Sequence, residues 1–254
     1  STRKGLERNL TAGEILAQMY AFKELYDIPF HSIVLMGAGE PLTNYKEVLH
    51  FIHLANDPEL LNISYRNITI STCGIVPQIY RLADENIPIT LAISLHAPND
   101  RIRNVLVPIS KNFRIKDVVS AAEYYFKKTK RRVTFEYILI GGVNDSLAQA
   151  KELITLVQDI PCKFNLIPFN PFPGSGLERS KPEAVKAFAD RLNGAGIVTT
   201  VRKVRGDDID AACGQLAGEI KDRTKLAEKR ANREIIIKEI SKSPAKATGG
   251  EKNV

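Results

Sequence analysis

The chain has 254 residues, of which 44% are hydrophobic and 26% are charged. These ordinary globular values exclude disorder, collagen and a coiled coil for the chain as a whole, and no apolar run is long enough to cross a membrane. The formal net charge of +7 fits a polyanionic partner and a basic surface without function equally well. Three widely spaced cysteines, with no C-x-x-C pair, indicate a reducing compartment, so we expect a cytoplasmic protein with no local metal site.

One pattern repeats along the chain: a β-branched run, a loop rich in Gly, Pro, Asn and Asp, and a stretch with helical period. A helix over residues 11–26 comes first, because Thr11 and Glu14 form a capping box. The expected strands cover residues 32–36, 67–70, 88–93, 132–140, 162–167 and 197–204. The other expected helices cover residues 45–54, 78–84, 115–128, 148–158 and 181–193, and a last helix follows the final strand.

Alternating strands and helices predict an α/β fold with a parallel sheet and right-handed crossovers. The polar loops all follow strands, as in (β/α) barrels, whose chemistry sits at the carboxyl ends of the strands. A flavodoxin-like open sheet is the alternative. Six strands are few for a closed eight-stranded barrel, so we expect an open barrel or a truncated chain. The catalytic domain is expected over residues 1–233, with a partly disordered tail over residues 234–254.

The first strand leads into the loop GAGEPLTN. The third glycine of a dinucleotide fingerprint is absent, but Gly37 and Gly39 allow a ligand to approach the backbone closely. Glu40 places a carboxylate at the strand end, where it would suit a cationic group such as an ammonium. A turn with a helix-capping acid is an equally good interpretation of this motif alone.

Three later loops carry further candidates. Ser71 ends a strand and suits a hydrogen bond to a ribose or a carboxylate, although an ST-turn is the better interpretation in isolation. His96 is the histidine that falls on one of the predicted loops after a strand. Asn170 lies between prolines that hold its loop rigid, so it is either a ligand contact or an amide that satisfies the loop.

Cys213 follows the last expected strand, in RGDDIDAACGQ. A helix N-terminus would lower its pKa and make the thiol a nucleophile, whereas Asp207, Asp208 and Asp210 oppose that shift. A cysteine among alanines on a helix is usually buried and inert, and the pattern alone leaves both interpretations open.

Five motifs taken together are highly specific: GAGEPLTN, ISTCGIVP, LAISLHAPNDRIRNVLVPI, PCKFNLIPFNPFPG and VRKVRGDDIDAACGQLAG. With them the chain, from about Leu6 to about Arg233, resembles the radical S-adenosylmethionine enzymes that methylate C2 of adenine in 23S ribosomal RNA and, for some members, in transfer RNA. The resemblance implies an incomplete (β/α)6 barrel whose first strand lies upstream of Ser1. It also implies a 4Fe–4S cluster whose three cysteines, in a C-x-x-x-C-x-x-C loop, lie just upstream of Ser1, so that this chain holds none of the iron ligands.

The resemblance implies an S-adenosylmethionine pocket made of Gly39, Glu40, Ser71, Ser94, Leu95, His96 and Asn170. Glu40 would meet the amino group of the cofactor. Cys213 would be the catalytic cysteine that one cofactor molecule methylates on sulfur. A second cofactor molecule, reduced by the cluster, would give a radical that activates this methyl group for addition to adenine, because C2 of adenine is not nucleophilic enough for direct transfer. Ribosomal RNA and, for some members, transfer RNA would be the partners of a monomer without membrane contact.

Two departures and three alternatives accompany the resemblance. Ala38 stands where the family usually has Met, and Cys73 stands where Ser is common. A close alternative is the antibiotic-resistance relative that methylates C8 of the same adenine, although NPFPG favours the C2 enzyme. A barrel lyase or aldolase would need a lysine or a phosphate-binding loop after one of the strands, and the sequence shows no clear example of either. Without the cluster cysteines, a non-catalytic RNA-binding fragment is the third alternative.

Basic residues concentrate in two runs, residues 128–132 and residues 221–233. Because phosphates dominate the affinity for a folded RNA, we expect Lys and Arg to surround the rim that bears Cys213. The second run, in a helix after Gly218, is the expected clamp, with Lys225, Lys229 and Arg230 as its cations.

Overall fold

The computed structural model describes residues 7–27, 29–37, 39–172 and 175–202. Its described strands form one parallel sheet in the order β1-β2-β3-β4-β5-β6. Their bounds are β1 (Ile33–Leu35), β2 (Ile68–Thr72), β3 (Thr90–Ser94), β4 (Val133–Leu139), β5 (Cys162–Pro168) and β6 (Val198–Val201). The predicted α/β fold with a parallel sheet of six strands is therefore confirmed.

Helices separate the strands along the chain. They are α1 (Ala12–Tyr26), α2 (Tyr45–Asn56), α3 (Val76–Asp84), α4 (Asp100–Leu106), α5 (Ile115–Thr129), α6 (Leu147–Val157) and α7 (Pro182–Gly194). The expected capping box of α1 is present, with the Thr11 hydroxyl accepting from the Glu14 N–H at 3.2 Å and the Glu14 carboxylate accepting from the Thr11 N–H at 2.9 Å. Within the described ranges, no helix has the length and apolar character that a membrane crossing needs.

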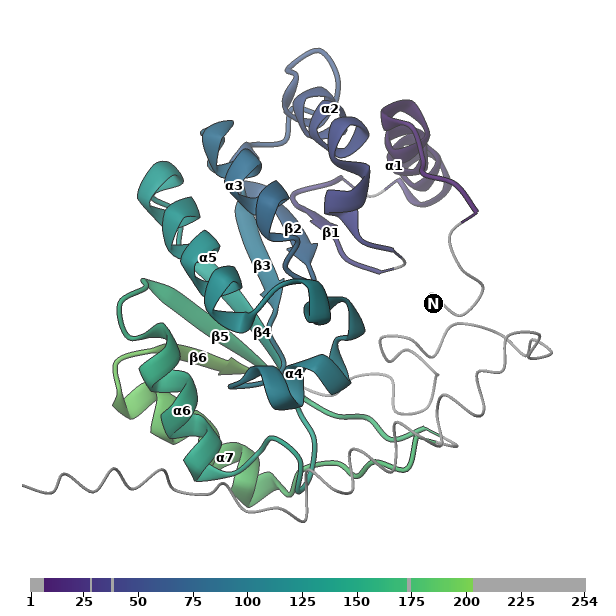
Figure 1. The fold of residues 1–254 in the computed structure, drawn as a ribbon. Coiled ribbons are helices and arrows are strands. Elements are labelled where there is room, and N and C mark those ends of the chain that lie inside the picture. Colours follow the sequence, from purple (N-terminus) through teal and green to yellow (C-terminus); the bar gives the residue numbers. More distant parts are fainter. Residues whose placement is uncertain (1–6, 28, 38, 173–174, 203–254) are drawn as a thin grey trace, which may run out of the picture.

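The sequential strand order decides between the two expected architectures. A flavodoxin-like sheet reverses direction at a switch point and carries helices on both faces, whereas here each crossover moves on to the next strand in the same direction. Figure 1 shows the result, with α3, α5 and α6 along one side of the sheet. The flavodoxin-like alternative is wrong, and the arrangement is that of a (β/α) barrel that stays open between the described β1 and β6.

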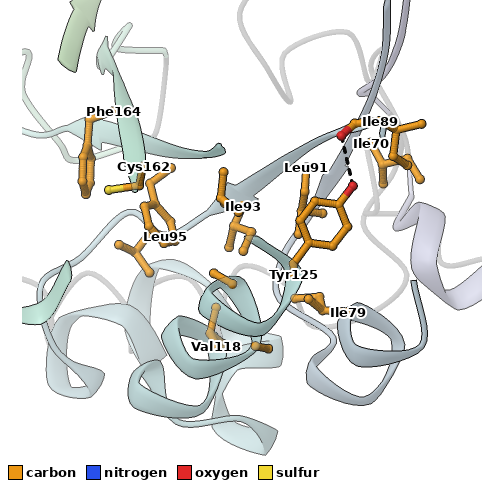
Figure 2. Close-up of a cluster of buried hydrophobic side chains, with 14 of the residues drawn as sticks. Ile70, Ile79, Ile89, Leu91, Ile93, Leu95, Val118, Tyr125, Cys162 and Phe164 are labelled. Atoms are coloured by element: carbon orange, nitrogen blue, oxygen red, sulfur yellow. Dashed lines mark hydrogen bonds between the residues drawn. The ribbon is translucent and has the colours of Figure 1, made fainter. Parts of the chain in front are cut away.

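The main core lies between the sheet and these helices. Side chains alternate along each strand, so Ile93, Phe135 and Phe164 face the helices and are fully buried. Figure 2 shows this layer, in which the Tyr125 hydroxyl of α5 donates a 3.0 Å hydrogen bond to the Ile89 carbonyl. Burial of each large apolar side chain stabilises the fold by about 1.5–3 kcal/mol. The apolar face of the sheet therefore packs against the helices, and the opposite face is left for polar residues.

Cys162 belongs to this core. It starts β5, is 6% exposed and packs against the same cluster. Burial raises the pKa of its thiol to about 12, and the charge of Arg132 opposes the shift only in part. The thiol therefore stays protonated at neutral pH and is chemically inert.

Candidate functional site at the carboxyl edge of the sheet

The face of the sheet that points away from the helices carries a polar layer across four strands. Ser94, Glu136, Asn165 and Thr200 are successive register partners on β3, β4, β5 and β6. Asn165 Nδ2 donates to Glu136 Oε2 at 2.8 Å, and Thr200 Oγ1 lies 3.3 Å from Asn165 Oδ1. Sequence reasoning missed Glu136 and Asn165, although a polar residue between apolar ones in FEY and FNL was a usable signal.

Glu136 is a nearly buried carboxyl, 7% exposed. Burial raises its pKa, while the hydrogen bond from Asn165 and the charges of Arg202 and Lys163 oppose the rise. The backbone carbonyl of the same residue accepts from the N–H groups of the two residues that follow Ser94, at 3.0 and 3.3 Å. Glu136 is thus fixed beside the end of β3.

Glu40 joins the ends of β1 and β2. Its Oε1 accepts from the Leu42 N–H at 3.0 Å and caps a short 3-10 helix, Pro41–Asn44. Its Oε2 accepts from the Cys73 N–H at 2.6 Å. The helix-capping interpretation is therefore correct, and it leaves further lone pairs on both oxygens for a cationic ligand. Gly39 precedes it at φ +89°, a conformation that L side chains rarely adopt.

Ser71 and Ser94 lie on the face that points away from the helices. Ser71 pairs in register with Ala92, two residues before Ser94, and both serines are half-buried. Leu95 differs, because its side chain is fully buried in the helix-side core. Only the backbone of Leu95 therefore reaches the rim.

His96 is held as a neutral imidazole. It adopts φ +59°, and its Nδ1 accepts from the Ile138 N–H at 3.1 Å, which leaves the ring proton on Nε2. Its carbonyl accepts from Asn144 Nδ2 at 2.8 Å. Burial and then the charge of Arg103 lower the pKa of His96 to about 4. At neutral pH the residue is thus an oriented N–H donor without charge.

Asn170 follows β5 by two residues and is oriented by Arg179. Arg179 Nη2 donates to Asn170 Oδ1, and its Nε donates to the Phe169 carbonyl at 3.1 Å. Asn170 is half-buried, and its amide nitrogen is the group that Arg179 does not engage. The amide oxygen therefore satisfies the loop, and the amide nitrogen is a donor that a ligand could engage, so the ligand contact stays a prediction.

The predicted pocket residues thus lie at the carboxyl ends of their strands, with Glu40 bonded directly to the end of β2 and Ser94 beside Glu136. Cys213 and the basic run over residues 221–233 lie outside the described residues. The other basic run, residues 128–132, covers the end of α5 and the residues that lead into β4. It therefore lies at the amino edge, opposite the candidate site.

The described residues do not fit an iron–sulfur cluster by themselves. No three His, Cys, Asp or Glu side chains in the described part of the chain gather into a group able to hold a metal ion. A 4Fe–4S cluster needs cysteine thiolates as ligands, and Cys162 is buried in the core on the helix side.

Comparison with known proteins places this geometry in a family. Residues 1–154 match the profile of the Radical SAM superfamily. The chain belongs to this superfamily, which implies S-adenosylmethionine as its cofactor together with a 4Fe–4S cluster.

Solved structures agree with this family. A radical SAM methyltransferase from Sphaerobacter thermophilus is 46% identical, with a TM-score of 0.80 over 85% of this chain, and this chain spans 64% of its length. SuiB from Streptococcus suis, solved with S-adenosylmethionine, is 14% identical with a TM-score of 0.56 over 83% of this chain and 48% of its own. A domain of pyruvate-formate lyase-activating enzyme from Bacteroides vulgatus is 15% identical with a TM-score of 0.51, over 68% of this chain and 100% of that domain. The last two show the fold alone.

Proposed function

We propose that this chain is the catalytic barrel of an enzyme that methylates C2 of adenine in 23S ribosomal RNA, and in transfer RNA where the enzyme has dual specificity. The observation that carries the proposal is that the motif residues Glu40, Ser71, Ser94, His96 and Asn170 all lie at the carboxyl edge of one sheet. The 46% identity to a radical SAM methyltransferase supports the reaction class.

The donors and acceptors at this edge fit S-adenosylmethionine. The Glu40 carboxylate suits the amino group, because it is anionic and has lone pairs left beyond its two backbone donors. The Ser71 and Ser94 hydroxyls, the His96 Nε2–H and the Asn170 amide supply neutral donors for oxygen and nitrogen acceptors. When bound, the cofactor supplies an activated methyl group.

Cys213 is proposed as the methyl acceptor and carrier. Its thiol would take up the methyl group that the bound cofactor supplies and would hold it as a methyl thioether. A carrier is needed because C2 of adenine is too poor a nucleophile for direct transfer. The cluster ligands are proposed to come from a segment upstream of Ser1 in the full-length protein, because the described residues do not supply them.

The polyanionic substrate fits the net charge of +7. The proposed clamp is the basic run over residues 221–233, because the run at residues 128–132 sits at the opposite edge of the sheet. We propose a cytoplasmic monomer.

The test is nucleoside analysis of a 23S ribosomal RNA fragment after anaerobic reaction with the full-length enzyme, its cluster and S-adenosylmethionine. Chromatography with mass spectrometry should find 2-methyladenosine at one adenine. Finding 8-methyladenosine would assign the chain to the resistance relative. An RNA that binds but stays unmethylated, with an intact cluster present, would contradict the proposal and favour a binding fragment.

A further inference from the structure

Arg103, on α4, is fully buried although it carries a positive charge. A buried guanidinium is costly unless its donors find acceptors. Its acceptors are three backbone carbonyls, with Nη2 donating to Cys73 at 2.6 Å and to Ser94 at 3.4 Å, and Nε donating to Leu95 at 3.2 Å. One side chain therefore binds two segments that are far apart in sequence.

These carbonyls lie where two neighbouring strands end. The last register pair between β2 and β3 is Thr72 with Ile93, so the residues that follow no longer hold each other through the sheet ladder. Strand-end carbonyls need other donors. The guanidinium of Arg103 supplies them and sets the spacing of the two ends.

The turn after β2 is shaped to admit this guanidinium. Gly74 adopts φ +95°, and a Cβ at this position would lie 3.2 Å from Arg103 Nη2 and 3.1 Å from Val118 Cγ2. The Thr72 hydroxyl accepts from the Gly74 N–H at 3.0 Å and fixes the turn. A side chain at position 74 would be strained at this φ and would crowd the guanidinium.

Within the described residues, backbone oxygens and not a carboxylate hold the charge. The acid on the same helix, Asp100, accepts from the Ile115 N–H at 2.7 Å and acts on Arg103 only through its charge. Arg103 Nη1 is buried without a hydrogen-bond partner in the described part of the chain. An arginine that served only an ion pair would face an acid. The contacts of Arg103 with backbone carbonyls instead indicate that it fixes the position of the loops after β2 and β3.

We infer that Arg103 is a positioning residue for the cofactor. It clamps the ends of β2 and β3 so that Ser71 and the segment from Ser94 to His96 meet S-adenosylmethionine at a fixed spacing. This inference rests on the proposed roles of those serines and of His96. Arg103 itself touches neither cofactor nor substrate.

The test measures the affinity of the full-length enzyme for S-adenosylhomocysteine by calorimetry. Arg103→Lys keeps the charge but cannot bridge three carbonyls, because an ammonium lacks the planar fork. The matched control is Tyr125→Phe, which removes a buried hydrogen bond to the Ile89 carbonyl at the other end of β3. We expect Arg103→Lys to weaken binding by about tenfold, while Tyr125→Phe stays within about twofold at a similar loss of melting temperature.

Equal affinity of these two variants would overturn the inference. The Ser94→Ala variant separates a failure of the positioning role from a failure of the proposed cofactor site. If Arg103→Lys and Ser94→Ala both bind S-adenosylhomocysteine normally, the proposed pocket is wrong. If Ser94→Ala binds weakly and Arg103→Lys binds normally, the pocket stands and only the positioning role of Arg103 fails. If Arg103→Lys does not fold, the exchange of the Arg103 Nε–H with water is followed in the wild type by NMR. Slower exchange on addition of S-adenosylhomocysteine supports the inference, and unchanged exchange overturns it.

Discussion

The N–H of Cys73 donates a 2.6 Å hydrogen bond to Oε2 of Glu40, so a carboxylate from the loop after β1 caps the end of β2. The same carboxylate is the proposed partner of the cofactor's amino group. Glu40 therefore has two tasks, one in holding two strand ends together and one in binding, and a suitable variant separates them.

Glu40→Gln should weaken binding of S-adenosylhomocysteine by at least about tenfold, because it removes the charge that is proposed to face the ammonium. It should also lower the free energy of unfolding by about 1 kcal/mol, since Gln accepts through only one oxygen. The matched control is Glu47→Gln, whose Oε2 accepts from the Ala12 N–H at 2.9 Å away from the rim. Calorimetry should show that only the first variant binds poorly, and equal binding by both would remove Glu40 from the pocket.

Glu136→Gln should make the protein more stable at neutral pH. The pKa of Glu136 is raised in the folded state, so its contribution to stability is fully present below the unfolded pKa, near 4.5, and is lost as pH rises through the folded value. Gln keeps an oxygen for Asn165 and does not ionise. Denaturant unfolding should show the advantage of the variant growing from pH 4 to pH 7.5.

The control for this experiment is Glu152→Gln. Both oxygens of Glu152 accept from the Asn99 amide, at 3.0 and 3.1 Å, but the side chain is exposed. It should not share the gain at neutral pH. A Glu136→Gln variant that is less stable than the wild type at pH 7.5 would show that Asn165, Arg202 and Lys163 outweigh burial, and would contradict a raised pKa of Glu136.

His96 should make the free energy of unfolding fall at acidic pH. Its pKa is lowered from 6.5 to about 4 in the folded state, so its contribution is fully present above 6.5 and is lost as pH falls toward 4. The expected slope is about 1.4 kcal/mol per pH unit within that window. His96→Asn should flatten this part of the stability curve, and an unchanged curve would contradict an imidazole whose pKa is lowered in the folded state.

Arg103→Met should raise the pKa of His96, because the positive charge of Arg103 is one of the two causes that lower it. Arg103→Lys should leave the pKa of His96 lower than Arg103→Met does, since it keeps a charge nearby. NMR titration of the imidazole carbons measures the difference. Identical titration of both variants would mean that the charge does not reach the ring.

The sequence predicted the strands, the capping box of α1 and the rim loops, because these depend on local period and turn chemistry. It missed α4, whose seven residues, DRIRNVL, are too few for a periodic apolar face. It also missed Arg103, because an arginine in a charged segment is expected at the surface. Arg103 is buried because the ends of β2 and β3 meet around it.

The polar layer across β3 to β6 was missed for the same kind of reason. Glu136 and Asn165 become neighbours through the register of parallel strands 29 residues apart, which local patterns do not specify. The resemblance also does not say which part of Leu95 would serve the pocket, and the buried side chain leaves only its backbone for that task.

Cys162→Ala should lower the free energy of unfolding by about 1 kcal/mol and leave RNA methylation intact, because Cys162 is a small buried apolar group in β5. Denaturant unfolding and the nucleoside assay measure the two effects. Loss of methylation in a folded Cys162→Ala protein would mean that the core thiol takes part in the chemistry. This variant is also the control for the corresponding change at Cys213.

Cys213 is proposed to carry the methyl group to RNA. The most direct measurement is mass spectrometry of the full-length enzyme after incubation with S-adenosylmethionine labelled in its methyl group. The peptide that contains Cys213 should carry the label on sulfur, and Cys213→Ala should abolish both this label and the methylation of adenine. An unlabelled Cys213 peptide in an enzyme that still methylates RNA would contradict the account.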